Sequence, residues 1–135
     1  MKKSWIAGLA LVAGLSLSDA ALACSCIVTP DAQVARDGSD AVFSGTVTGI
    51  ARTGRMLKVT IQVDRAWKGV QCGEVTLETA ADGATCGFGF EQGKSYLVYA
   101  VEENGLTTNL CTRTRSIDQA DEDLGALGEP EKSCS

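Results

Sequence analysis

The sequence contains no histidine. This absence excludes Ser-His-Asp and Cys-His catalytic triads, imidazole general bases and zinc sites with histidine ligands. The chain also lacks a Cys-x-x-Cys redox motif, a phosphate-binding loop and a Gly-x-Ser-x-Gly nucleophile elbow. We therefore expect that the protein is not an enzyme and that it uses no cofactor.

Aromatic and basic residues are also scarce. Phe, Trp and Tyr make up 5% of the chain, and 12 Lys and Arg stand against 17 Asp and Glu, which gives a formal net charge of −5. Surfaces that bind nucleic acids or anionic membranes need clustered positive charge, and single-stranded nucleic acids also need aromatic side chains for stacking. The composition therefore predicts no nucleic-acid partner.

Residues 1–23 have the pattern of a secretory signal peptide. A lysine pair at residues 2–3 is followed by an apolar run over residues 5–17, and Ala21-Leu22-Ala23 supplies the small residues of a cleavage site. The apolar run is too short for a stable transmembrane helix. We expect cleavage after Ala23 and export to the periplasm or the cell exterior.

Cleavage there makes Cys24 the first residue of a single domain that spans residues 24–135. A cysteine in this position is also the mark of a lipoprotein, in which lipid is attached to the cysteine and its α-amine is acylated. The match to a lipoprotein signal is partial, because Leu22 lies one position too late. Lipidation at Cys24 stays an alternative, and a membrane contact is expected only in that case.

Every cysteine lies after the expected cleavage site. The chain has six of them: Cys24, Cys26, Cys72, Cys86, Cys111 and Cys134. An even number in a small exported domain predicts a disulfide framework, whose pairing the count alone leaves open. A Cys-x-Cys metal carrier is a further alternative, but it would require reduced thiols in an oxidising compartment.

Alternating apolar and polar residues predict short strands. We expect them over residues 40–50, 56–67, 74–79, 95–101 and 106–112, with a glycine-rich loop over 80–93. A helix is expected to begin at Ser116, which forms a capping box with Gln119, and to end before Gly128. The predicted fold is mainly β: a five-stranded antiparallel Greek-key barrel of the OB-fold type with a C-terminal helix, held by disulfides.

Several motifs in this order resemble the N-terminal domain of the tissue inhibitors of metalloproteinases, within the wider netrin-like family. They are Cys24-Ser25-Cys26, Ser39-Asp40-Ala41-Val42-Phe43, Trp67-Lys68-Gly69, Thr85-Cys86-Gly87-Phe88 and the run from Thr107 to Cys111. The resemblance covers nearly all of residues 24–135. It implies the disulfides Cys24–Cys86 and Cys26–Cys111, which leaves Cys72–Cys134 as the third.

The resemblance also implies a function. Members of that family inhibit zinc endopeptidases by placing the α-amine and the carbonyl oxygen of their first residue, here Cys24, on the catalytic zinc. Ser25 would then enter the adjacent substrate pocket. The implied inhibitory ridge consists of Cys24, Ser25, Cys26, Ala84, Thr85 and Cys86. We expect a monomer whose partner is a zinc metalloprotease; the alternative is a non-inhibitory netrin-like binding or structural module of the cell envelope.

Overall fold

A computed structural model describes residue 14, residues 24–27 and residues 31–135 of the chain. The expected signal peptide, apart from Gly14, lies outside these residues. Among the described residues, no helix is both long and apolar enough to cross a membrane.

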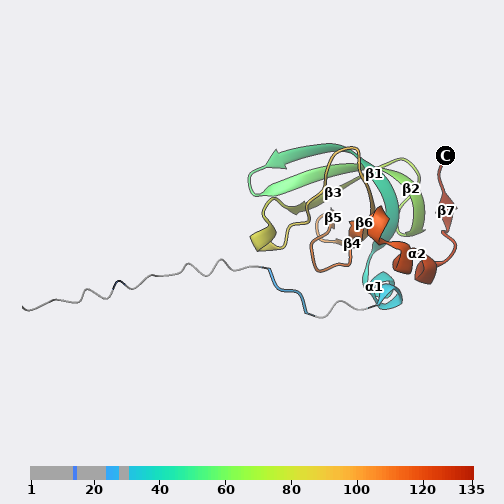
Figure 1. The fold of residues 1–135 in the computed structure, drawn as a ribbon. Coiled ribbons are helices and arrows are strands. Elements are labelled where there is room, and N and C mark those ends of the chain that lie inside the picture. The colour runs from blue at the N-terminus through green and yellow to red at the C-terminus, as the bar shows by residue number, and fades with distance from the viewer. Residues whose placement is uncertain (1–13, 15–23, 28–30) are drawn as a thin grey trace, which may run out of the picture.

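The domain is a closed β-barrel, as the sequence predicts. Its strands are β1 (Ala41–Thr53), β2 (Met56–Lys68), β3 (Glu74–Ala80), β4 (Ser95–Glu102) and β5 (Leu106–Thr107). They pair in the order β1-β2-β3-β5-β4, and β4 returns to β1 to close the barrel (Figure 1). Every pairing is antiparallel except β3 with β5, which is parallel.

The alternation of side chains explains the barrel. In β2, Val59, Ile61 and Val63 are buried inside it, whereas Lys58 and Gln62 are exposed. The pairing of β1 with β2 shifts register at three places along β1, which bends the strand around the barrel. One shift lies at Gly45, where a Cβ atom would come 2.4 Å from the carbonyl oxygen of Gln62. Only glycine fits at this bend.

The fifth strand is shorter than predicted. It covers two residues, Leu106–Thr107, and the chain then turns away from the sheet. Thr108 and Thr114 bond to each other and to the carbonyl of Tyr99 through their hydroxyls, and the side chain of Asn109 accepts from the backbone N–H of Cys111. These side-chain bonds stand in place of a backbone ladder beyond Thr107.

The helical segments also differ from the prediction. Ser116 belongs to β6 (Arg115–Ser116), where it pairs with Tyr96, so its backbone is extended and its hydroxyl caps nothing. A 3₁₀ turn (η2, Ile117–Gln119) follows, and the helix α2 (Asp121–Leu127) ends at Gly128, whose φ is +67°. The predicted capping box is wrong: Ser116 precedes η2, its side chain makes no cap hydrogen bond there, and α2 begins only after Ala120.

Two helices cover one side of the sheet. Helix α1 (Ala32–Gly38) precedes β1 and is capped by Asp31, whose side chain accepts from the N–H of Val34. Helices α1 and α2 lie side by side and pack on a second apolar cluster that includes Val42, Trp67 and Tyr99. A last strand, β7 (Lys132–Ser133), pairs with β2 and fixes the C-terminal tail.

Candidate functional site

The structure pairs all six cysteines. The disulfides are Cys24–Cys86, Cys26–Cys111 and Cys72–Cys134, with Cα–Cα distances of 5.0, 5.2 and 5.6 Å. These are the pairs that the resemblance implies. No cysteine is left free.

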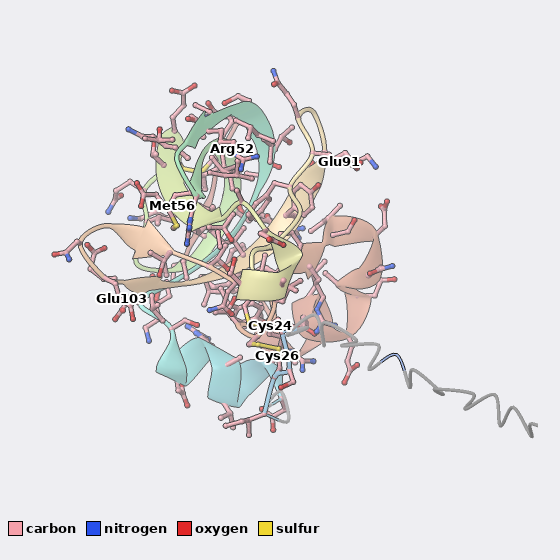
Figure 2. The ribbon with its side chains drawn as sticks, turned by 90° about the vertical axis from the view of Figure 1, so that its left-hand side faces the viewer. Cys24, Cys26, Arg52, Met56, Glu91 and Glu103 are labelled. Carbon is pink, nitrogen blue, oxygen red and sulfur yellow. A yellow bond between two sulfur atoms is a disulfide. The ribbon has the colours of Figure 1, made fainter. Side chains whose placement is uncertain are left out.

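Two of the bridges hold the start of the described domain against two separate loops. Cys24 is tied to the loop after β3, and Cys26 is tied to the segment after β5. The two bridges touch, because the Sγ atom of Cys24 lies 3.8 Å from that of Cys111. We call residues 24–26 and 83–86 together the ridge. Figure 2 shows Cys24 and Cys26 beside the turn of this loop.

Most of the ridge is exposed. Ser25, Cys26, Ala84 and Thr85 lie on the surface, while Cys24 and Cys86 are partly buried. Each site residue expected from the sequence is therefore found in one place, although residue 24 is 62 positions from residue 86. The family resemblance predicted that residues 24–26 and 83–86 would meet, whereas the spacing of residues along the chain did not.

The loop that carries residues 83–86 is held by its own hydrogen bonds. The side chain of Asp82 accepts from the N–H of Ala84 at 2.9 Å, and the hydroxyl of Thr85 donates to the carbonyl of Asp82 at 2.9 Å. Cys86 adopts a left-handed conformation, with φ of 68°. A Cβ atom on Gly87 would come 1.9 Å from the carbonyl oxygen of Ala80, so only glycine fits there. The loop is thus preorganised without a partner.

The two loops beneath the ridge are also bonded to each other. The N–H of Leu110 donates to the carbonyl of Cys86 at 2.9 Å. The neighbouring N–H of Cys111 is satisfied by Asn109 at 2.7 Å. The ridge is therefore cross-linked by sulfur above and by hydrogen bonds below, which limits the entropy that it could lose on binding a partner.

Exposed apolar side chains surround the ridge, a feature that the sequence analysis did not identify. The large exposed hydrophobic residues among the described positions are Ile27, Val34, Leu110 and Met56. Ile27 and Leu110 are next to the Cys26–Cys111 bridge, and Val34 lines a hollow with Cys111. Met56 lines a second hollow with Thr85. Such a concentration is typical of a protein-binding surface.

The chemistry of the ridge depends on the backbone of Cys24. Sulfur atoms of Cys24, Cys86 and Cys111 lie within 4.8 Å of one another, but all three are in disulfides and offer no thiolate to a metal. Cleavage after Ala23 would leave a free α-amine beside the carbonyl oxygen of Cys24. An amine and a carbonyl oxygen of one residue close a five-membered ring when both bind the same metal ion.

A second group of charged residues, which the sequence analysis missed, lies in the interior. The carboxylate of Asp123 is fully buried, accepts two hydrogen bonds from Arg113 at 2.7 and 2.8 Å, and accepts a third from the hydroxyl of Tyr99 at 2.7 Å. Arg115 lies 3.6 Å away. We call these four residues the Asp123 cluster.

The electrostatics of this cluster are those of a structural contact. Burial by itself would raise the pKa of Asp123, but the hydrogen bonds from Arg113 and Tyr99 and the charge of Arg115 hold that pKa below its usual value. Burial and the carboxylate raise the pKa of the Tyr99 hydroxyl far above its usual value. All four residues are engaged with one another, so we assign the cluster to holding α2 on the barrel.

Comparison with the models of known protein families and with curated proteins gives no match for this chain.

Proposed function

We propose that the protein is an exported inhibitor of zinc metalloproteases, in which the α-amine and carbonyl oxygen of Cys24 bind the zinc of the protease. The observation that supports this most directly is the double disulfide attachment of residues 24–26, which presents the backbone of Cys24 on a rigid, exposed ridge. In this proposal the protein acts by binding and is not itself an enzyme.

The zinc chemistry agrees with the ligands that the ridge provides. A catalytic zinc keeps a coordination position open for water or substrate. A neutral amine can displace that water, whereas an ammonium group cannot. A free α-amine has a pKa of about 7.7–8.0, so binding releases a proton at neutral pH. Inhibition should therefore strengthen as the pH rises through that range.

The remaining ridge residues contact the protease cleft in this proposal. In this proposal the exposed side chain of Ser25, next to the chelating residue, enters the adjoining substrate pocket. Ala84 and Thr85 supply the second half of the contact. The exposed apolar residues on both sides of the ridge extend the interface beyond the zinc.

The alternative is a lipid-anchored module of the envelope without inhibitory activity. It requires lipid to be attached to Cys24. A lipid thioether needs the Sγ atom of Cys24, and the structure uses that atom in the bridge to Cys86. Lipid and disulfide exclude each other at this sulfur. The bridge therefore favours the free amine, and three disulfides also suit an oxidising, exported environment.

The test compares the mature protein, beginning at Cys24, with a variant that has one extra alanine before Cys24. The extra residue converts the amine into an amide and moves the new amine off the zinc, so we expect inhibition of zinc endopeptidases to weaken on the order of 100-fold. A protein with the extra alanine after Ser135 is the matched control and should keep full potency. Equal potency of both N-terminal forms would refute chelation.

The intact mass of the native mature protein decides between the two candidates. A mass equal to residues 24–135 minus six hydrogens, as three disulfides require, means a free amine. An added lipid mass means an acylated nitrogen that cannot bind zinc, and the inhibitor proposal would then fail.

A further inference from the structure

A groove adjoins the ridge at the tip of the β1–β2 hairpin. Its volume is about 400 Å³, and it is lined by Arg52, Arg55, Met56, Ala80, Ala81, Asp82 and Thr85. Thr85 also belongs to the ridge, so the two surfaces are continuous. Figure 2 shows Arg52 and Met56 on the same side of the molecule as Cys24 and Cys26. We call this hollow the hairpin groove.

The hairpin groove is part of the folded framework. Strands β1 and β2 stay paired up to Thr53 and Met56, and the connecting turn contains Gly54 with φ of +61°. The N–H of Ala81 donates to the carbonyl of Arg55 at 2.9 Å, which bonds the hairpin tip to the loop before the ridge. The hairpin is therefore held in a fixed relation to Thr85.

The charges of the hairpin groove are unusual for this molecule. Neither Arg52 nor Arg55 has an acidic partner within 4.0 Å among the residues that the structure describes. The Nε of Arg52 donates only to the carbonyl of Gly54. Asp82 is the one acidic residue of the lining, and an oxygen of its carboxylate already accepts from Ala84. With two arginines and one aspartate, the lining has a net charge of +1 in a chain whose net charge is −5.

The rest of the lining is apolar. Met56 is 36% exposed, and Ala80 and Ala81 continue the same wall. An apolar wall next to two guanidinium groups suits an acidic side chain that has an apolar neighbour. Guanidinium groups bind carboxylates with two parallel hydrogen bonds, which gives both strength and orientation.

We propose that the hairpin groove receives an acidic side chain, flanked by an apolar residue, from the rim of the cleft of the target protease. The identification of the partner as a protease rests on the proposed function. The groove is assigned to the same interface because it shares Thr85 with the ridge. On this proposal the ridge recognises the zinc that all such proteases have in common. The hairpin groove selects the proteases whose cleft has an acidic rim.

The first test reverses the two charges with Arg52→Glu/Arg55→Glu. We expect inhibition of a protease that the unaltered protein inhibits to weaken about tenfold or more, mainly through slower association, because complementary charge steers the encounter. Added salt should slow association of the unaltered protein, because it screens an attraction, and should speed association of this variant, because it screens a repulsion. The neutral pair Arg52→Gln/Arg55→Gln should give a smaller loss in the same direction.

A matched control changes the net charge equally at other places. Lys94→Glu/Lys132→Glu reverses one lysine in the loop before β4 and one in β7, which lies at the opposite end of the barrel from the hairpin tip (Figure 1). The control should retain the association rate of the unaltered protein within about twofold. An equal loss in both double variants, or no loss in either, would overturn the proposal.

A second readout separates the hairpin groove from the zinc chemistry. Isotope-labelled mature protein is titrated with a capped Asp-Leu-Glu-Leu peptide and with its uncharged Asn-Leu-Gln-Leu counterpart, up to millimolar concentration, while amide resonances are followed. The acidic peptide should shift the amides of residues 52, 55, 56 and 85, also in the variant with the extra alanine before Cys24. The uncharged peptide should not.

The two proposals can fail separately. Peptide shifts in a protein that inhibits no zinc endopeptidase would support the hairpin groove and refute the inhibitor. Zinc-dependent inhibition without peptide shifts, and with full potency of Arg52→Glu/Arg55→Glu, would refute the groove and leave the inhibitor in place.

Discussion

The ridge and the Asp123 cluster are both attached to the segment of residues 108–115, and they are attached by opposite means. Cys111 ties this segment to the exposed ridge through sulfur. Arg113, two residues later, ties it to the interior through the buried carboxylate of Asp123. Residues 108–115 therefore connect the ridge, which is the proposed binding surface, with the Asp123 cluster, which holds α2.

The difference follows from access to water. Hydrogen bonds and ion pairs on an exposed ridge compete with water and contribute little, whereas a disulfide constrains the unfolded chain whether or not water is present. Asp123 lies where water is excluded, so its charge must be fully satisfied, and removing one partner leaves another charge stranded. Covalent bonds thus rigidify the surface, and a saturated ionic contact fixes the interior.

Removal of a bridge at the ridge should have the largest effect. In Cys24→Ser/Cys86→Ser, the lost bridge closed a loop with a sequence separation of 62. We expect the free energy of unfolding in urea to fall by about 4 kcal/mol on the loop-entropy model, and inhibition to be lost with it.

The third bridge supplies a control of the same loop length. Cys72–Cys134 also has a sequence separation of 62, but it joins the segment after β2 to the C-terminal tail. Cys72→Ser/Cys134→Ser should lose a similar free energy of unfolding and keep inhibition. Equal loss of inhibition in both variants would show that the ridge has no special dependence on its own bridge.

Asp123→Ala should have the next largest effect, on stability alone. The substitution leaves Arg113 and the Tyr99 hydroxyl without their shared acceptor. We expect the free energy of unfolding to fall by about 3 kcal/mol, the lower end for a broken buried pair, because Arg115 and Arg113 are partly reached by solvent. Urea unfolding at pH 7 measures the loss.

Asp121→Ala is the control in the same helix. Asp121 is exposed in the first turn of α2, where an acidic side chain is stabilised by the helix dipole. A loss of about 0.3–1 kcal/mol is expected there. If Asp123→Ala lowered the free energy of unfolding no more than Asp121→Ala, the Asp123 cluster would not be what holds α2. The proposed difference between the ridge and the interior would then be wrong.

A smaller effect should appear on acidification. The pKa of Asp123 is lower in the folded protein than in the unfolded chain, where it is about 3.9. The folded state therefore gains stability from this carboxylate above that value, and loses it as the pH falls through the folded pKa. The loss should be smaller than in Asp123→Ala, since a protonated carboxyl still forms hydrogen bonds.

Asp123→Asn isolates this contribution. Its side chain cannot ionise, so its free energy of unfolding should change less between pH 7 and acidic pH than that of the unaltered protein. Urea unfolding over a pH series measures both slopes. Parallel slopes for the two proteins would show that the pKa of Asp123 is the same in the folded and unfolded states.

Much of the barrel could be predicted from local patterns, and the failures are informative. The alternation in β2 places Val59, Ile61 and Val63 inside, and the structure agrees. Ser116 has the sequence of a helix cap, yet it pairs with Tyr96 in the sheet, and the 3₁₀ turn that follows it receives no side-chain cap hydrogen bond. The strand expected over residues 106–112 stops at Thr107, because the Thr108 hydroxyl takes the carbonyl of Tyr99 in β4 and the Asn109 side chain takes the N–H of Cys111.

The candidate site was predictable only in part. The cysteine count predicts a disulfide framework, but the pairing came from a family resemblance. The hairpin groove had no signal in the sequence, because Arg52 and Thr85 are brought together by strand pairing and loop closure. The same is true of Tyr99 and Asp123, which belong to separate elements of the fold.

By itself, the sequence determined the class of the fold, the absence of histidine chemistry and the need for disulfides in a small domain. Those properties depend on composition and on contacts between near neighbours, which can be seen along the chain. Only the tertiary structure decided which loops meet Cys24, where the exposed apolar residues gather and how Asp123 is satisfied. Each of these depends on contacts between distant residues, whose positions the closure of the barrel establishes.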